Sequence, residues 1–301
     1  EEDIKLQFIT PAITTKWDIS KITMETSITD GRINISGNVV VRSKPKKADY
    51  ILYLNRANPI AIIEAKDNNH SVSYGLQQAM EYAKMMDLPF AFSSNGDGFA
   101  EHDFLTGTTR TFSMDDFPTE SQLIERYKIE LNGGKGITPK EECIINQPFY
   151  SSHNSYEPRY YQRNAINKTL KAVADGQDRI LLVMATGTGK TYTAFQIVYR
   201  LLKSGIKRKI LYLADRNVLV DQSIQQDFSP LEKTIHKINV AKDDKLTIGS
   251  HEVYFSLYQQ LVGADGVEHY SELFNKDFFD LVIVDECHRG SAKDDSRWKE
   301  I

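Results

Sequence analysis

The strongest constraint on the fold is a short apolar segment that leads into a glycine-rich turn in the second half of the chain. Residues 180–184 read Ile-Leu-Leu-Val-Met, and residues 185–191 follow directly as Ala-Thr-Gly-Thr-Gly-Lys-Thr. A continuous apolar run is typical of a strand that is buried on both faces. The segment after the turn has the apolar spacing of a helix. Strand, glycine turn and helix in this order predict a phosphate-binding loop, because glycines let backbone N–H groups at a helix start approach an anion.

The side chains of this loop extend the prediction to a nucleotide and its metal ion. Lys190 can reach terminal phosphates, and the Thr191 hydroxyl can bind Mg²⁺. Met184 stands where the strict pattern has its first glycine. The alternative is a glycine-rich turn with an incidental lysine. The loop residues predicted to contact the nucleotide are Thr186, Gly187, Thr188, Gly189, Lys190 and Thr191.

A second acidic motif supports the nucleotide site. Residues 278–288 read Phe-Phe-Asp-Leu-Val-Ile-Val-Asp-Glu-Cys-His, so that a predicted strand at 279–284 ends on Asp285 and Glu286. Ligands of α/β sheets bind beyond the carboxyl ends of the strands. We expect Asp285 to hold Mg²⁺ through water and Glu286 to orient or activate the attacking water. Alone, the pair would more simply be a solvated strand end, but with the glycine loop it predicts a site for ATP and Mg²⁺.

The length and the local composition predict two domains. A chain of 301 residues is long enough for two, and residues 131–158 are rich in glycine, proline and serine, which favours a boundary there. We therefore predict a first domain at 1–135, a linker at 136–158 and a second domain at 159–301. In the second domain elements alternate, which predicts a parallel sheet covered by helices. The expected helices are 160–175, 189–203, 217–226 and 254–262, and the expected strands are 179–185, 209–214, 246–249 and 279–284.

The first half carries a different group of charged residues. Asp49 precedes a predicted hairpin of strands at 50–54 and 60–64, and Glu64 and Lys66 lie at its end. Residues two apart on a strand share one face. Asp49 and Glu64 would bind Mg²⁺, which lowers the pKa of a bound water, and Lys66 would stabilise developing charge. So short a pattern is most simply an ion-paired surface hairpin.

Three further features favour a phosphodiesterase site. The run 60–63 is apolar, so Glu64 would emerge from a buried strand. Gln78 and Tyr82 share one face of a predicted helix at 72–86. The net charge is −4, so a nucleic acid must be met by local basic patches. A solvated loop is the alternative explanation for the one such patch beside Asp49, which contains Arg42, Lys44, Lys46 and Lys47.

Together these motifs resemble a known family. The ATGTGKT loop with Asp285-Glu286-Cys287-His288 resembles the first RecA-like domain of superfamily 2 helicases and translocases. Asp49, Glu64 and Lys66, with Gln78 and Tyr82, resemble the PD-(D/E)xK nuclease domain of the R (HsdR-like) subunits of type I restriction enzymes, and so does the segment 48–103. The resemblance implies an α/β chain with an N-terminal α+β PD-(D/E)xK endonuclease-like domain followed by a RecA-like parallel-sheet P-loop domain.

The resemblance also implies activity, cofactors and partners. It implies Mg²⁺-dependent cleavage of double-stranded DNA, ATP-dependent DNA translocation, and a complex with methyltransferase and specificity subunits. Gln162 resembles the adenine-reading Q motif, although a plain helix-surface glutamine is an open alternative. Residues 210–216 resemble a motif that touches the DNA backbone. The family also has an acidic residue on its first helix, for which Glu1, Glu2 or Asp3 are candidates.

Other properties define what else is expected. The second motor domain is absent from residues 1–301, so we expect weak nucleotide binding and poor turnover. Cys143 and Cys287 form no CxxC pair, which argues against a disulfide framework or zinc site and fits a reducing cytoplasm. No apolar run approaches the ~20 residues that span a bilayer. Two rival functions remain: a DNA-repair or antiviral helicase with an inactive nuclease-like domain, and a first half that only docks partner proteins.

Overall fold

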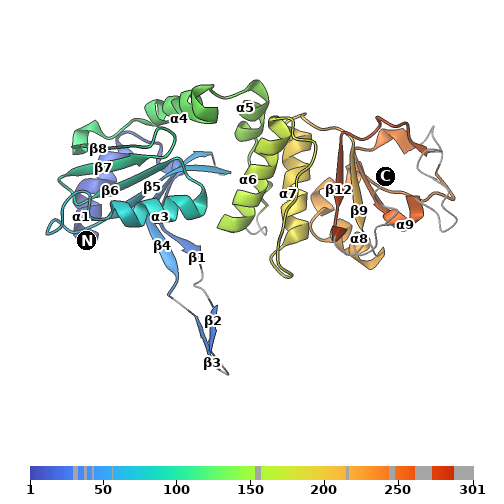
Figure 1. Cartoon of the computed structure of the whole chain (residues 1–301), viewed down its shortest axis with the longest axis horizontal. Coiled ribbons are helices and arrows are strands. Elements are labelled where there is room, and N and C mark those ends of the chain that lie inside the picture. Colours follow the sequence, from blue (N-terminus) through green and yellow to red (C-terminus); the bar gives the residue numbers. More distant parts are fainter. Residues whose placement is uncertain are drawn as a thin grey trace. The chain divides into compact units, whose positions relative to one another are not determined.

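The structure is a computed structural model that divides into two compact units (Figure 1). It describes residues 1–29, 33–36, 39–42, 44–55, 57–152, 157–214, 217–243, 248–261 and 273–287. The units are Glu1–Gly176 and Gln177–Ile301. This division lies after the predicted linker at 136–158, because the helices on both sides of that region pack within the first unit. Each unit is described by itself.

The first unit is built on a mixed sheet of six strands. The order is β1-β4-β5-β6-β7-β8, and only β5 and β6 run parallel. A separate hairpin is formed by β2 (Ile33–Ser36) and β3 (Val39–Arg42). The predicted hairpin around Glu64 is confirmed. The strands of the sheet are β1 (Ile22–Thr29), β4 (Lys46–Asn55), β5 (Asn58–Ala65), β6 (Phe90–Ser94), β7 (Gly98–Asp103) and β8 (Thr108–Ser113).

Helices cover the sheet of the first unit. The parallel connection from β5 to β6 runs through α3, which begins four residues later than the predicted start of its helix at 72. The N-terminal segment is helical from residue 2 to residue 14, with a π-helical turn at Lys5–Ile9 between two α-helical pieces. The helices are α1 (Glu2–Ile4), α2 (Thr10–Thr14), α3 (Leu76–Met86), α4 (Glu120–Gly134), α5 (Pro139–Asn146) and α6 (Tyr160–Ala174), with short 3₁₀ turns at Ile19–Lys21 and Met114–Asp116.

The central strands of the sheet are buried on both faces, which explains the continuous apolar runs in β4 and β5. Side chains alternate between the faces of a strand. Tyr50 and Leu52 of β4 pack on one face with Ile9 and Ile13 of the N-terminal helical segment. Residues of β4 such as Ile51 pack on the other face, against the side of α3 that carries Ala79, Tyr82, Ala83 and Met86. The carboxylates at the ends of β4 and β5 therefore emerge from an apolar layer rather than from a solvated ribbon.

The second unit contains a four-stranded parallel sheet of order β10-β11-β9-β12. All three ladders between its described strands are parallel, which confirms the predicted parallel-sheet class. The strands are β9 (Ile210–Ala214), β10 (Ile235–Lys237), β11 (Val253–Leu257) and β12 (Leu281–Val284). The helices are α7 (Lys190–Lys203), α8 (Asn217–Gln225) and α9 (Tyr258–Leu261), with 3₁₀ turns at Ser229–Thr234 and Ile248–Ser250.

Two predicted elements of this unit differ from the structure. The first half of the helix predicted at 254–262 is β11, because short apolar runs such as Val-Tyr-Phe fit either period and β11 finds a ladder on β9, whereas residues 258–261 are helical as predicted. The strand predicted at 246–249 is a 3₁₀ turn from residue 248, and residues 244–247 lie outside the described part.

The apolar run before the glycine loop also differs from the prediction. Residues 180–185 are not a strand, and the side chain of Val183 is 88% exposed. A strand needs a neighbouring strand to satisfy its backbone groups, and residues 180–185 are in no ladder of the described residues. High β-propensity alone therefore does not make residues 180–185 a strand, because they pair with no strand among the described residues.

No helix in the described ranges combines the length and apolar character that crossing a membrane requires.

The β7–β8 ladder allows a test of the sheet. A Cβ atom at Gly98 would lie 2.7 Å from the backbone oxygen of Phe112, which is closer than real contacts allow. We expect Gly98→Ala to destabilise the first unit by roughly 1–3 kcal/mol, because the ladder must shift. Gly107 is a matched control in the turn between the same strands, since it has φ +73° and open space around it. Asparagine tolerates that conformation, so Gly107→Asn should cost about 1 kcal/mol or less. Urea unfolding measures both, and equal losses would contradict the tight contact.

Candidate active sites

The strand register brings three acidic residues into one row across the first sheet. Tyr50 of β4 pairs with Ile63 of β5, so Asp49 lies beside Glu64. Met24 and Thr26 of β1 pair with Tyr50 and Ala48, so Glu25 lies on the other side of Asp49. The sequence predicted the neighbourhood of Asp49 and Glu64 and missed Glu25.

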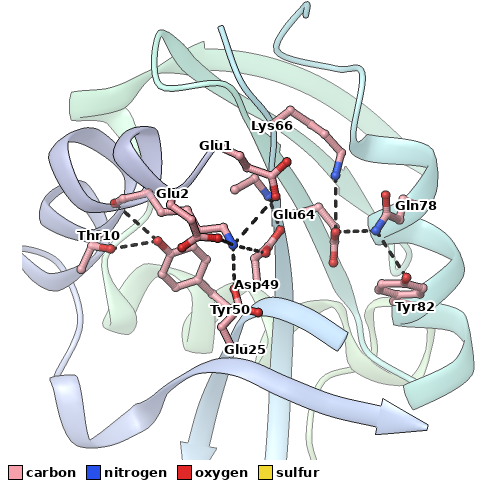
Figure 2. Close-up of polar contacts among 12 residues, drawn as sticks. Glu1, Glu2, Thr10, Glu25, Asp49, Tyr50, Glu64, Lys66, Gln78 and Tyr82 are labelled. Carbon is pink, nitrogen blue, oxygen red and sulfur yellow. Dashed lines mark hydrogen bonds and ion pairs between the residues drawn. The ribbon is translucent and has the colours of Figure 1, made fainter. Parts of the chain in front are cut away.

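The carboxylate of Glu64 is held by the residues that the sequence singled out (Figure 2). Its Oε2 accepts a hydrogen bond of 2.7 Å from Gln78 Nε2, and Lys66 Nζ lies 3.8 Å from the same oxygen. Gln78 Nε2 also lies 3.3 Å from the Tyr82 hydroxyl. Asp49 Oδ2 accepts the Ala65 N–H at 2.7 Å. All five predicted residues of the first half therefore meet at one place.

This carboxylate pair carries an electrostatic cost. Glu64 is 1% exposed and Asp49 is 8% exposed. Burial, followed by the charge of Asp49, raises the pKa of Glu64 to about 8, although the charge of Lys66 opposes this rise. Among the described residues, Glu64 Oε1 is buried and has no hydrogen-bond partner. A cation beside Glu64 Oε1 would remove this cost.

The donor set fits Mg²⁺ in particular. In the described part of the chain no three His, Cys, Asp or Glu side chains are arranged to hold a metal ion together. Mg²⁺ keeps several waters and typically takes only one or two carboxylates from a protein. Asp49 and Glu64, with the unpartnered Oε1 of Glu64, therefore fit this ion.

A tight turn after β6 fixes the segment that carries Lys66. The Lys66 N–H donates to the Ser94 carbonyl at 2.8 Å. Ser93 Oγ donates to the Val72 carbonyl at 2.5 Å, and Asn95 Nδ2 donates to the carbonyl of His70 at 2.9 Å. The turn at 93–98 is part of the segment 48–103 that resembles the family. Its hydrogen bonds hold the loop between Lys66 and α3 in place.

Residues around the carboxylates differ in how well the sequence identified them. Of the three acidic candidates near the first helix, Glu1 acts on the pair through its charge, which contributes to the raised pKa of Glu64. Glu2 hydrogen-bonds to Lys5, a residue that the sequence did not indicate. In the predicted basic cluster, Lys46 Nζ lies 5.3 Å from the centre of the Tyr82 ring. Lys44 and Lys47 are exposed, and the side chain of Arg42 lies outside the described part.

The second unit presents the glycine loop at the start of α7. Gly187 and Gly189 have φ values of +77° and +80°, which glycine adopts without strain. Thr188 Oγ1 donates to the Ala185 carbonyl at 2.6 Å. Lys190 is the first residue of α7, and its Nζ lies 2.6 Å from Glu286 Oε1. Thr186 is exposed and Thr191 is half-buried.

The acidic pair follows β12 as the sequence predicted. Asp285 Oδ2 accepts the Tyr212 hydroxyl at 3.0 Å, and Asp285 Oδ1 accepts the Glu286 N–H at 2.9 Å. Burial, followed by the charge of Asp285, raises the pKa of Tyr212 well above its ordinary value, so Tyr212 stays a donor. Glu286 has φ +51°, a left-handed conformation that is uncommon for a residue with a Cβ.

Four predicted positions have a different outcome. Gln162 lies on α6 in the first unit, and its Oε1 accepts the Arg159 N–H at 2.9 Å, which caps that helix. The structure therefore gives Gln162 a local role, and its reading of adenine stays a prediction. Of the motif at 210–216, Asp215 and Arg216 lie outside the described residues, and so does His288.

Comparison with known proteins covers both units. Residues 13–118 match the family model "Type I restriction enzyme R protein N terminus (HSDR_N)", and residues 155–301 match "Type III restriction enzyme, res subunit". The chain is 43% identical over its whole length to the type I restriction enzyme EcoAI endonuclease subunit of Escherichia coli, of which it covers 37%. The chain is a homologue of the R subunits of type I restriction enzymes. The chain thus has an HsdR N-terminal domain and a helicase-like domain.

Further relatives agree with this assignment. The chain is 28% identical to the EcoKI endonuclease subunit of Escherichia coli strain K12, over 82% of this chain and 24% of that subunit. A fragment structure of a protein described as an HsdR subunit, from Vibrio vulnificus YJ016, superimposes with a TM-score of 0.76 at 36% identity. That match covers 95% of this chain and 51% of the other. The fold class is therefore confirmed, and the chain spans less than half the length of the curated relatives that it matches.

The ion pair between Lys190 and Glu286 predicts that replacing one partner or the other changes ATP binding in opposite directions. Lys190 must leave Glu286 to bind a phosphate, so Glu286→Gln should tighten ATP binding a few-fold, since such pairs are worth up to about 1 kcal/mol. Lys190→Met should weaken binding strongly, because it removes the phosphate contact. Lys203→Met, in the last turn of the same helix, is the control and should change nothing. Titration with a fluorescent ATP analogue measures all three, and weaker binding by the Glu286→Gln protein would refute this role of the pair.

Proposed function

We propose that this chain is the DNA-cleaving portion of a type I restriction R subunit, joined to the first half of its ATP-driven motor. The observation that carries the nuclease proposal is the convergence of Gln78 and Lys66 on Glu64, next to Asp49. Such a group of a buried carboxylate pair and a lysine suits metal-dependent phosphodiester hydrolysis. The homology to endonuclease subunits supports the same class of reaction.

Each residue has a separate task in this proposal. When bound, Mg²⁺ would supply a water of lowered pKa and would shield the scissile phosphate. Asp49 and Glu64 would hold the ion. Gln78 fixes Glu64 Oε2 by its hydrogen bond, which leaves Oε1 for the ion. Lys66 lies 3.8 Å from Glu64, too far for a tight hydrogen bond, so its ammonium is available to a phosphate oxygen.

The second unit would bind ATP with Mg²⁺ at its glycine loop. The contacts of Lys190 with Glu286 and of Tyr212 with Asp285 support this, because they gather the cation and both carboxylates at the carboxyl end of the sheet. Thr191 and Asp285 would hold Mg²⁺, the backbone from Thr186 to Gly189 would surround the phosphates, and Glu286 would orient water. Translocation along double-stranded DNA is part of the proposal through homology alone.

The partners follow from the same homology. We infer that the whole protein acts on double-stranded DNA in the cytoplasm, in a complex with methyltransferase and specificity subunits. The rival view of a purely docking first half is less well supported. A docking surface gives no reason for Glu64 to be buried with an unpartnered oxygen.

Point variants test the nuclease proposal. Glu64→Gln and Lys66→Ala should each lower Mg²⁺-dependent nicking of supercoiled DNA by roughly 100-fold or more, because each removes a charge that acts on the reacting phosphate. Binding of a fluorescent ATP analogue should be unchanged. Glu81→Gln, on the exposed side of α3, is the matched control and should nick normally.

Other outcomes of this experiment have defined meanings. Nicking that survives both changes would refute the assigned site and favour a docking role. Loss of both activities in one variant would indicate misfolding, which thermal melting detects.

A further inference from the structure

Lys5 lies among the carboxylates of Glu2, Glu25 and Asp49, although nothing in its sequence context indicated a role. Its Nζ is 2.6 Å from Asp49 Oδ1, 2.6 Å from Glu25 Oε1 and 2.9 Å from Glu2 Oε1. Glu1 Oε1 is 3.9 Å away. Lys5 is 3% exposed, and lysines are almost never fully buried unless they are paired. All three N–H bonds of the ammonium are therefore used by carboxylates.

Two unusual backbone conformations accompany these contacts. Lys5 begins the π-helical turn Lys5–Ile9, and π turns within helices occur frequently at functional sites. Glu25 has φ +48° within β1, a left-handed conformation that is strained for a residue other than glycine. Such conformations persist only when the surrounding contacts support them. The two residues with these conformations, Lys5 and Glu25, form an ion pair of 2.6 Å through their side chains.

The row of carboxylates shows which positions remain for another cation. Glu25, Asp49 and Glu64 are neighbours on three adjacent strands, where like charges destabilise the sheet. Lys5 bonds to Glu25 and Asp49. No lysine bridges Asp49 and Glu64 in the described residues, and Glu64 Oε1 is left without a partner there. Lys5 therefore lies between Glu25 and Asp49, and the neighbouring position, between Asp49 and Glu64, is the one that fits Mg²⁺.

The charge of Lys5 acts on Asp49, one of the two proposed metal ligands. Burial alone would lower the pKa of Lys5, but hydrogen bonds to Asp49, Glu25 and Glu2 raise it well above its ordinary value, so the group stays charged at neutral pH. A charged ammonium that touches Asp49 repels a divalent cation bound to the same carboxylate. The same positive charge attracts a phosphate group, which the carboxylates would otherwise repel.

We propose that Lys5 is a resident counter-cation of the nuclease site, which weakens the binding of divalent metal and strengthens the binding of DNA phosphate. The inference rests on the proposed nuclease function. It deepens that function by assigning a positioning and charge-setting role to a residue of the N-terminal helical segment. Lys5 contacts the metal-binding carboxylate Asp49 and acts through it.

The test measures the affinities of the full chain for Mn²⁺ and for DNA, which should change in opposite directions. Lys5→Met should tighten Mn²⁺ binding by roughly tenfold, since a like charge within a few ångströms is removed. Lys5→Met should also weaken the binding of a short DNA duplex measured in EDTA. Loss of a purely structural contact would weaken both. Mn²⁺ binding is read by electron paramagnetic resonance and DNA binding by fluorescence anisotropy.

Three further variants keep the test decisive if Lys5→Met folds poorly. Glu25→Gln removes a half-exposed negative charge from the same cluster and should give the reverse pattern, with weaker Mn²⁺ binding and tighter DNA binding. Lys5→Arg keeps the charge and should resemble the unchanged protein. Lys21→Met removes a lysine from a different ion pair, with Glu120, and should leave both affinities unchanged.

The outcomes separate the inference from the function on which it rests. If the unchanged chain neither binds Mn²⁺ nor nicks DNA, the nuclease proposal fails. If the unchanged chain does both, two results overturn the role of Lys5. One is a Lys5→Met protein in which both affinities fall or neither changes. The other is a Glu25→Gln protein in which the two affinities move in the same direction.

Discussion

The first unit depends on one costly arrangement, two neighbouring carboxylates at the end of a sheet that is apolar on both faces. The faces are covered by the N-terminal helical segment and by α3, which leaves Glu64 1% exposed and raises its pKa. Burial of a charge without a partner is unfavourable. Each surrounding group therefore has a place in an electrostatic balance: Gln78 and Lys66 act on Glu64, and the Ala65 N–H and Lys5 act on Asp49.

The second unit balances its charges differently. Lys190 and Glu286 form a close ion pair, and Asp285 accepts two hydrogen bonds. The cation of the glycine loop is thus already neutralised by the residue proposed to orient water. Binding of a nucleotide would have to exchange this pair for phosphate contacts. An exchange of this kind would couple Glu286 to the occupancy of the loop, since the ion pair with Lys190 breaks when Lys190 moves to the phosphate.

The sequence identified the parts of these sites that local rules determine. The two-residue spacing of Glu64 and Lys66, the four-residue spacing of Gln78 and Tyr82, and the short hairpin each have a fixed geometry, so their convergence was predictable. Lys5 and Glu25 were not. They come from segments far from Glu64 in the chain, and they meet through a π-helical turn and a left-handed residue in a strand, neither of which has a sequence signature.

The same distinction explains where the second unit differs from the predictions. The run predicted as a strand at 179–185 has strong strand propensity, yet a strand also requires a neighbour, and this pairing cannot be seen from the run itself. Val253–Leu257 fits helix and strand periods equally well, and its parallel register with β9 decides the outcome.

The two lysines of the nuclease site illustrate how one cluster can serve both a cation and a polyanion. Lys5 makes three short contacts and is 3% exposed, so it cannot move toward a substrate without leaving three carboxylates. The ammonium of Lys66 lies 3.8 Å from Glu64 Oε2, and the backbone of its loop is braced by the turn at 93–98. A fixed ammonium can only set the local potential, whereas a loosely held one on a rigid backbone can reach a phosphate oxygen. In the proposed nuclease site Lys5 would therefore set the potential, and Lys66 would act on the phosphate.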